Sequence, residues 1–232
     1  MAHAKSGVSR FYLVLGGLAL LGVIVLVWQM SRPKSTPIRA GVPVEVTDTS
    51  GFRGYLLGSD SAAVEITEYA DYQCPVCRDF ELVQFPTVRR QLIETGLVRW
   101  RYRDYPLDAI HPHARLAAHA AACANDQGKY WDMHAMIYER HPEWYDARSA
   151  DGHFREYASA VGLNTGTYDT CMQEAKYAGR IEASAQEGNQ VGVGATPTFL
   201  IGGNLYPGIL VSDSMRKIVQ GLLPKSGTPP TP

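Results

Sequence analysis

The chain has 232 residues, of which 45% are hydrophobic and 19% are charged, and its formal net charge is −1. This length suits one or two domains with a real hydrophobic core, and it excludes a mini-protein held together only by disulfides. A charge near zero gives no sign of a nucleic-acid-binding protein, which usually carries a basic surplus. The charge is uneven, because the first 40 residues hold five basic side chains and no acid, which leaves the remainder acidic.

The N-terminal part reads as a membrane anchor. Residues 1–10 form a short flank, and residues 11–30 follow with no Asp, Glu, Lys or Arg. A helix of ~20 residues spans ~30 Å, which is the thickness of the hydrocarbon core of a bilayer. A cleaved signal peptide is the alternative, but its apolar region is usually ~7–15 residues long and ends at a small-x-small site. No such site follows Met30, so we predict one uncleaved transmembrane helix. Basic residues flank both ends, so charge does not orient it.

The rest of the chain reads as a linker, one folded domain and a tail. Residues 31–54 are rich in Pro and Gly, which predicts a linker. The folded domain is predicted over residues 55–223, and residues 224–232 are predicted to be a disordered tail. This domain has the size of a single structural unit.

The predicted elements of the domain alternate between strands and helices. Residues 64–69 are β-branched and aromatic, which predicts a strand, and helical apolar spacing then continues up to Gly96. Val98, Trp100 and Tyr102 alternate with arginines and predict a second strand. Helices are predicted over residues 112–190, with the last one at residues 168–187. A hairpin across Gly202-Gly203 and a final amphipathic helix complete the domain.

Two of the four cysteines form the motif Cys74-Pro75-Val76-Cys77. Such a pair is half of a zinc site, a redox dithiol, or a chance occurrence. A structural zinc site needs two further ligands, usually as a second close pair, whereas Cys123 and Cys171 are 48 positions apart. We therefore predict no metal site. The motif lies where a strand ends and a helix begins, so the helix N-terminus would stabilise a thiolate at Cys74. Cys77, one turn further on, is then the less exposed resolving thiol.

The segment from Glu68 to Cys77 resembles the active-site segment of the DsbA family of thioredoxin-fold proteins. It is most similar to the membrane-anchored or secreted bacterial branch that includes BdbD-like oxidases. A second block, residues 192–201, contains Thr196-Pro197, where thioredoxin folds have a cis-proline beside the redox cysteines. The resemblance implies a cis bond here; a turn proline before a strand is the alternative. It covers residues 55–223 and implies an α/β thioredoxin fold with a helical insertion at about residues 112–190, preceded by one transmembrane helix.

The resemblance also implies roles for single residues. A substrate thiolate would attack the exposed Cys74 of the Cys74–Cys77 disulfide, and a second thiol would then release the reduced enzyme. Glu68 would be the partly buried acid that relays the proton of Cys77, with an exposed strand residue as the alternative. The residues expected to shape the substrate groove are Pro75, Val76, Thr196 and Pro197. Val76 cannot hydrogen-bond the thiolate, which predicts a moderate oxidant.

Cys123 and Cys171 fall in the helical insertion. Relatives of this branch often carry a disulfide there, so we expect a structural disulfide. Inert buried thiols and a second redox-active disulfide are the alternatives. Such a disulfide favours an oxidising compartment and places the catalytic domain outside the cytoplasm, either periplasmic or at the cell surface. Five histidines are spread along the predicted helical segments without a metal-ligand pattern: His111, His113, His119, His134 and His141.

The resemblance thus implies a membrane-tethered thiol–disulfide oxidoreductase that forms disulfide bonds in exported proteins with free thiols. Its redox group is the Cys74–Cys77 disulfide, without a further cofactor or nucleic-acid partner, and it is expected to be a monomer. The family implies reoxidation by a quinone-linked membrane partner, either DsbB-like or VKOR-like. A reductase or isomerase of the same fold is one alternative, although residues 31–54 are too few for the dimerisation domain of the isomerases. A non-catalytic thioredoxin-like binding module is the alternative from another class, and the intact cysteines argue against it.

Overall fold

The computed structural model describes residues 16–17, 21–23, 42–43 and 51–224. The chain divides into two units, residues 1–37 and residues 38–232. In the first unit, the described residues are helical. Among all the residues described, no helix has the length and apolar character needed to cross a bilayer. The predicted flank, most of the predicted anchor at residues 11–30 and the tail from residue 225 lie outside the described residues.

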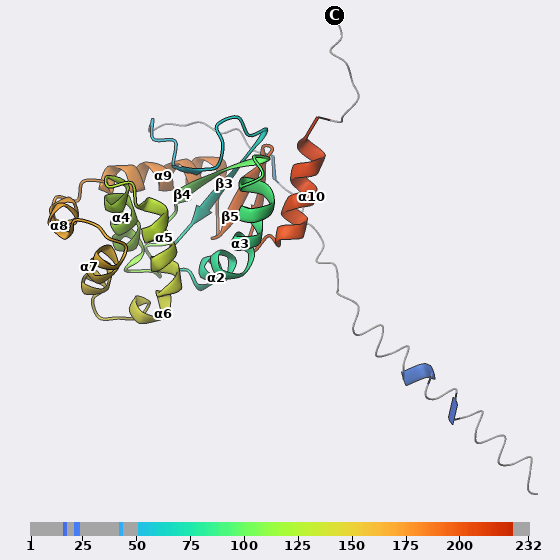
Figure 1. Ribbon diagram of the computed structural model, residues 1–232, viewed down its shortest axis with the longest axis horizontal. Helices are drawn as coiled ribbons and strands as arrows, with labels where there is room; N and C mark the ends of the chain where they lie inside the picture. The colour runs from blue at the N-terminus through green and yellow to red at the C-terminus, as the bar shows by residue number, and fades with distance from the viewer. Residues whose placement is uncertain (1–15, 18–20, 24–41, 44–50, 225–232) are drawn as a thin grey trace, which may run out of the picture. The chain divides into compact units, whose positions relative to one another are not determined.

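A mixed sheet forms the centre of the second unit. In the part of the chain that the structure describes, this sheet has six strands in the order β1-β6-β5-β3-β4-β2 (Figure 1). The strands are β1 (Val42–Pro43), β2 (Tyr55–Leu57), β3 (Val64–Ala70), β4 (Val98–Asp104), β5 (Thr198–Ile201) and β6 (Asn204–Pro207). Strands β3 and β4 are parallel neighbours, and the other pairs are antiparallel. A parallel pair needs a long crossover connection, and a helical segment supplies it here.

This crossover is one continuous helical run. It comprises α2 (Pro75–Asp79), the π-helical η1 (Phe80–Gln84), α3 (Phe85–Val88) and the π-helical η2 (Arg89–Ile93). The run continues through Pro86, which lies in α3. Because proline cannot donate the usual backbone hydrogen bond, the helix widens to a π-type turn before α3 and again after it. Its apolar side chains and those of α10 (Ser212–Leu222) cover one face of the sheet, where Phe80, Trp100 and Phe199 are fully buried.

The segment between β4 and β5 contains a group of helices. They are α4 (Ala114–Asn125), α5 (Tyr130–Glu139), α6 (His141–Trp144), α7 (Asp151–Ala160), α8 (Thr165–Gln173) and α9 (Ala178–Val191). Figure 1 shows α4 to α8 gathered at one side of the sheet, away from α3 and α10. Helix α9 packs on the second face of the sheet. Its residues Ala185 and Val191 form one hydrophobic cluster with Tyr69 and Leu200 of the strands. The result is a thioredoxin-type α/β fold with a helical insertion.

A buried ion network fixes α9 to β4. Glu187 of α9 is fully buried and accepts hydrogen bonds from Arg101 at 2.9 Å, from Arg103 and from the Tyr69 hydroxyl at 2.6 Å. A buried carboxylate is stable only when its oxygens are paired, so these donors set where α9 lies. The same arginines donate to the backbone carbonyls of Phe52 and Arg53, which fastens the segment before β2 onto the sheet.

The structure differs from the sequence prediction at two places. Within the predicted linker of residues 31–54, Val42–Pro43 form β1 and pair with β6, a strand that the sequence analysis did not predict. The helix predicted at residues 168–187 is two helices, α8 and α9, because Ala175 has a positive φ of 47° in the turn that separates them. A strand of two residues is too short for a periodic pattern, and alanine gives no signal for a left-handed turn.

The predicted hairpin is confirmed. Strands β5 and β6 are joined by Gly202 and Gly203, whose φ angles are 56° and 80°. A two-residue turn with both central residues at positive φ has the twist that suits an antiparallel pair, and glycine adopts that conformation without a steric penalty.

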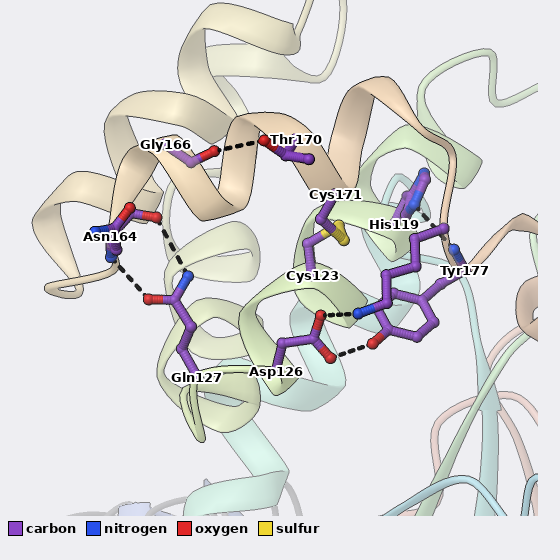
Figure 2. The surroundings of a disulfide bond; sticks show 10 residues. His119, Cys123, Asp126, Gln127, Asn164, Gly166, Thr170, Cys171 and Tyr177 are labelled. Atoms are coloured by element: carbon purple, nitrogen blue, oxygen red, sulfur yellow. Dashed lines mark hydrogen bonds and ion pairs between the residues drawn. A yellow bond between two sulfur atoms is a disulfide. The ribbon is translucent and has the colours of Figure 1, made fainter.

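A disulfide joins two helices of the insertion. Cys123 on α4 and Cys171 on α8 are bonded, with their Cα atoms 5.8 Å apart (Figure 2). The bond joins residues that are 48 positions apart in the sequence. It therefore removes a large part of the conformational freedom that the insertion has in the unfolded chain. The pairing expected from the sequence is therefore confirmed, and its structural role can be measured.

Removing this disulfide should lower stability without changing the fold. In a Cys74→Ser/Cys77→Ser background, we expect the further changes Cys123→Ser and Cys171→Ser to lower the free energy of unfolding by about 2–4 kcal/mol, because the unfolded chain gains the entropy of the open loop. Urea unfolding followed by circular dichroism measures this difference. The background variant, which keeps the disulfide, is the control. A difference below about 1 kcal/mol would contradict a structural role.

Candidate active site

Cys74 stands at the junction between β3 and α2. Its backbone N–H donates to the carbonyl of Asp71 at 3.1 Å, and its own carbonyl accepts from Arg78 N–H at 3.1 Å. Cys74 is the N-cap residue of α2, with extended backbone angles, and Pro75 occupies the first helical turn. Proline fits there because the first N–H groups of a helix have no intrahelical partner. The sulfur of Cys74 therefore lies at the positive end of the helix.

Cys74 is less exposed than the sequence suggested. It keeps only 5% of its accessible surface, and Cys77 keeps none. The reason is the segment before β5, because the backbone carbonyl of Thr196 approaches the Cys74 sulfur to 3.6 Å and covers it. Cys74 is still the more accessible of the two sulfurs, and both are free thiols in this structure. Pro75 and Val76, between them, are exposed, Val76 at 43%.

The two sulfurs have opposite acidities. The pKa of Cys74 is lowered to about 6, mainly by a hydrogen bond from the Cys77 thiol and further by contacts with Thr196 and with the backbone N–H groups of Cys77 and Val76. Burial acts in the other direction at Cys74. At Cys77 burial dominates and raises the pKa well above its usual value, and the charges of Cys74 and Glu68 raise it further. At neutral pH the dithiol therefore carries its negative charge on Cys74.

Thr196 and Pro197 lie next to the sulfur, as the resemblance implied. The bond between them is cis. The Thr196 hydroxyl is buried and has no other hydrogen-bond partner in the described part of the chain. The carbonyl of Pro197 accepts from Gly208 N–H at 2.7 Å, which places the exposed Ile209 beside this turn.

Glu68 is buried, so the exposed alternative is excluded. It lies on β3 with the parity of Val64 and Ile66, on the face that packs against the crossover helix. Glu65 has the opposite parity, is partly exposed and pairs with Arg99 at 2.7 Å. Neither carboxylate oxygen of Glu68 has a hydrogen-bond partner among the described residues. Burial, followed by repulsion from Glu81, raises the pKa of Glu68 well above its usual range.

Glu81 is a site residue that the sequence analysis missed. It lies on η1, four residues after Cys77, and helical residues at that spacing share a face. This spacing was the available signal. Burial raises the pKa of Glu81 as well, so the Glu68–Glu81 pair retains a proton near neutral pH. Glu81 lines a cavity of about 300 Å³, and His134 of α5 lies on its wall with Nε2 3.4 Å from a Glu81 oxygen. Burial lowers the pKa of His134 to about 3, so this imidazole is neutral.

The turn before Cys74 is held by the insertion. Asp71 is buried, and its carboxylate accepts hydrogen bonds from Gln73 N–H at 2.7 Å and Leu107 N–H at 2.7 Å, with His111 Nδ1 at 2.8 Å. The Gln73 side chain bonds the backbone of His113 and Tyr145. These contacts tie the residues between β3 and α2 to segments that are far away in sequence.

The remaining histidines have structural partners. His141 Nε2 lies 3.0 Å from the carbonyl of Gln73, and His113 Nε2 lies 2.8 Å from the carbonyl of Ala147. His119 accepts from the backbone N–H of Tyr177 at 3.2 Å. Arg78, which follows the motif, pairs with Asp79 at 3.6 Å. The geometry thus unites five of the predicted residues around the sulfurs: Cys74, Cys77, Glu68, Thr196 and Pro197.

The family follows from comparison with known proteins. Residues 52–221 match a family model described as Thioredoxin. The chain belongs to the thioredoxin family. Its DsbA-like branch is indicated by a relative, disulfide bond formation protein D of Bacillus subtilis, which is 23% identical over 71% of this chain and 75% of its own length. The chain therefore resembles a DsbA-like thiol–disulfide oxidoreductase.

Solved structures share the fold, and a further relative matches in sequence. BdbD from Bacillus subtilis has a TM-score of 0.69 at 21% identity, covering 79% of this chain and 98% of that one. DsbA from Chlamydia trachomatis has a TM-score of 0.65 at 18% identity, covering 78% and 97%. The Na(+)/H(+) antiporter NhaA 3 of Salinispora tropica is 33% identical over 67% of this chain. The chain spans only 22% of that antiporter's length.

The low pKa of Cys74 in this DsbA-like enzyme can be tested by alkylation. We expect the rate with iodoacetamide to rise through a midpoint near pH 6 in the reduced protein, because only the thiolate reacts. Thr196→Val should move the midpoint to higher pH by removing a group that stabilises the thiolate. Thr198→Val is the matched control, because that hydroxyl donates to the Ala195 carbonyl instead. Equal midpoints in Thr196→Val and the native chain would show that Thr196 does not stabilise the Cys74 thiolate.

Glu68 should assist the step in which Cys77 attacks. The raised pKa of Cys77 leaves little thiolate, so a base must take its proton when it resolves the mixed disulfide at Cys74. We expect Glu68→Gln to slow release of a Cys74-linked model peptide on the order of 100-fold at pH 7. Stopped-flow fluorescence measures this release. Glu65→Gln, on the same strand but paired with Arg99, should leave the rate unchanged. If both variants release the peptide at the native rate, Glu68 has no part in proton transfer.

Proposed function

We propose that this DsbA-like enzyme is an extracytoplasmic oxidase that forms disulfide bonds in exported proteins with free thiols. A substrate thiolate attacks Cys74 of the Cys74–Cys77 disulfide, and a second substrate thiol attacks the resulting mixed disulfide. The substrate is oxidised by two electrons, and the enzyme is left as the dithiol. This chemistry needs no cofactor beyond the cysteine pair.

The lowered pKa of Cys74 carries the proposal. A sulfur that is stabilised as a thiolate is a good leaving group and makes the reduced enzyme favourable, so the disulfide takes electrons readily. The reductase and isomerase alternatives require the opposite balance or free exchange in both directions. The Val76 side chain contributes no hydrogen bond to the thiolate, so we expect an oxidant weaker than the strongest members of the family.

The surface around Cys74 suits an extended apolar peptide. Val76 and Ile209 are apolar side chains that are each 43% exposed. Val76 lies between the two cysteines of the motif, and Ile209 lies beside the turn at Pro197. Exposed side chains of this kind bind apolar groups of a partner. In the proposed complex, Pro75 and Val76 contact the substrate from the helix, while Thr196 and Pro197 contact it from the turn before β5. We expect contact through these apolar side chains to select no single peptide sequence.

The proposed location is the outer side of a membrane. Residues 11–30 serve as a single-pass anchor in this proposal, and the catalytic domain acts as a monomer outside the cytoplasm. The disulfide between Cys123 and Cys171 supports an oxidising compartment, since such bonds rarely persist in the cytosol. A quinone-linked membrane protein, DsbB-like or VKOR-like, would then return the enzyme to its disulfide form.

The reduction potential tests the direction of the reaction. We expect a value between those of thioredoxin, about −270 mV, and DsbA, about −120 mV, in glutathione equilibria of the full chain. The pH dependence provides a second reading. Below pH 6 reduction takes up two protons, and above pH 6 the lowered Cys74 pKa leaves only one to be taken up. The potential should therefore fall by about 60 mV per pH unit below pH 6 and by about 30 mV above it.

Thiol trapping in cells completes the test. An oxidase should be found with Cys74 and Cys77 mainly as the disulfide. A potential near that of thioredoxin, together with cysteines held reduced in the cell, would overturn the oxidase and favour a reductase. In a Cys123→Ser/Cys171→Ser variant, thiol trapping reports the redox state of the active-site pair alone, because only that pair can then be modified.

A further inference from the structure

The disulfide of the insertion has a histidine beside it that the proposed reaction does not use. His119 and Cys123 are one turn apart on α4, and Cys171 faces them from α8 (Figure 2). One ligand atom from each residue, a ring nitrogen and two sulfurs, lies within 4.8 Å of the others. All three residues are buried. This cluster is separate from Cys74 and Cys77 in sequence and belongs to different elements.

Two thiolates and an imidazole form a donor set for thiophilic cations. Zinc takes this combination in open sites with three protein ligands and a water molecule. A helical spacing of four residues places His119 and Cys123 on one face, so two of the donors are positioned by a single helix. The third donor comes from a helix that the fold already packs against α4. The disulfide and a metal ion exclude each other, because metal ligation requires both sulfurs as thiolates.

The surroundings hold the imidazole in place. Nε2 of His119 accepts the N–H of Tyr177, so this nitrogen bears a lone pair, as a metal ligand must. Tyr177 is held in turn by its hydroxyl, which donates to Asp126 at the end of α4, and Lys176 pairs with the same carboxylate at 2.7 Å (Figure 2). A cation on Nε2 would take the place of the Tyr177 N–H, which therefore loses its acceptor when the site fills.

We propose that Cys123, Cys171 and His119 bind a thiophilic divalent cation such as Zn²⁺ whenever the cysteine pair is in its thiol form. The newly made chain has these thiols before the disulfide forms. Binding releases two protons from the thiols and moves no electrons, so no oxidant or reductant takes part. Two sulfurs each ~2.3 Å from a tetrahedral ion are roughly 3.8 Å apart. The sulfurs must therefore separate from their bonded distance, by rotation of the cysteine side chains. Metal binding and disulfide formation then compete for the same pair.

Zinc titration of the thiol form tests this site. The full chain with Cys74→Ser and Cys77→Ser, reduced and kept anaerobic, offers only Cys123 and Cys171 as thiols. We expect one Zn²⁺ per chain by native mass spectrometry and an affinity at least tenfold weaker for His119→Ala in competition with a chelating indicator. His153→Ala, a partly exposed histidine of the same insertion, is the matched control. The disulfide form should bind no zinc.

Two further readings keep the test decisive if the thiol form is unstable. Zinc should restore the helical circular dichroism of the reduced chain, and this restoration should be lost in His119→Ala. Zinc should also slow formation of the Cys123–Cys171 disulfide by oxidised glutathione at least tenfold. The proposal is overturned if the reduced chain takes up no zinc, or if His119→Ala binds it as tightly as the parent. Neither result depends on the redox activity of Cys74 and Cys77, so the proposed oxidase is judged separately.

Discussion

The carboxylate of Asp71 joins the sheet, the active-site helix and the insertion at one point. It accepts backbone N–H groups from Gln73 and Leu107 and contacts His111, while the Asp71 carbonyl accepts the N–H of Cys74. A carboxylate without access to water is stable only with such partners, and charge-assisted hydrogen bonds are about twice as strong as neutral ones. The turn after β3 therefore has one geometry, and that geometry sets the residue at which α2 begins.

The start of α2 decides the electrostatics of the two sulfurs. Cys74 lies before the first turn, where a hydrogen bond from the Cys77 thiol and, more weakly, the N–H groups of Val76 and Cys77 lower its pKa. Cys77 lies one turn later on the inner face of the helix, where burial and the neighbouring Cys74 raise its pKa. A shift of the helix start by one residue would rotate the inner face by ~100° and remove both effects. The asymmetry that thiol–disulfide exchange needs is thus a consequence of how the turn is held.

The sequence contained the local part of this site but not its long-range part. Cys74, Cys77 and the cis bond at Pro197 were predictable because each belongs to a short motif that repeats across a family. Asp71 was not singled out and His134 was given no role at the site, because their importance depends on contacts with residues 36 to 62 positions away. The break between α8 and α9 was missed for a different reason. Ala175 adopts a positive φ that alanine rarely shows, so tertiary contacts override its local preference.

Burying two carboxylic acids costs free energy, and a proposed role in proton movement gives a reason for that cost. Glu68 and Glu81 are held in the interior without a cation between them, and burial favours their neutral forms. A protonated pair can exchange a proton without placing a net charge in the core. In the proposed relay, Glu68 takes the proton of Cys77 while it passes its own proton to Glu81, and Glu81 releases a proton into the bordering cavity of about 300 Å³. Helix α5 supplies Trp131 and His134 to that cavity, so in this proposed relay the insertion would line the path of the proton toward solvent.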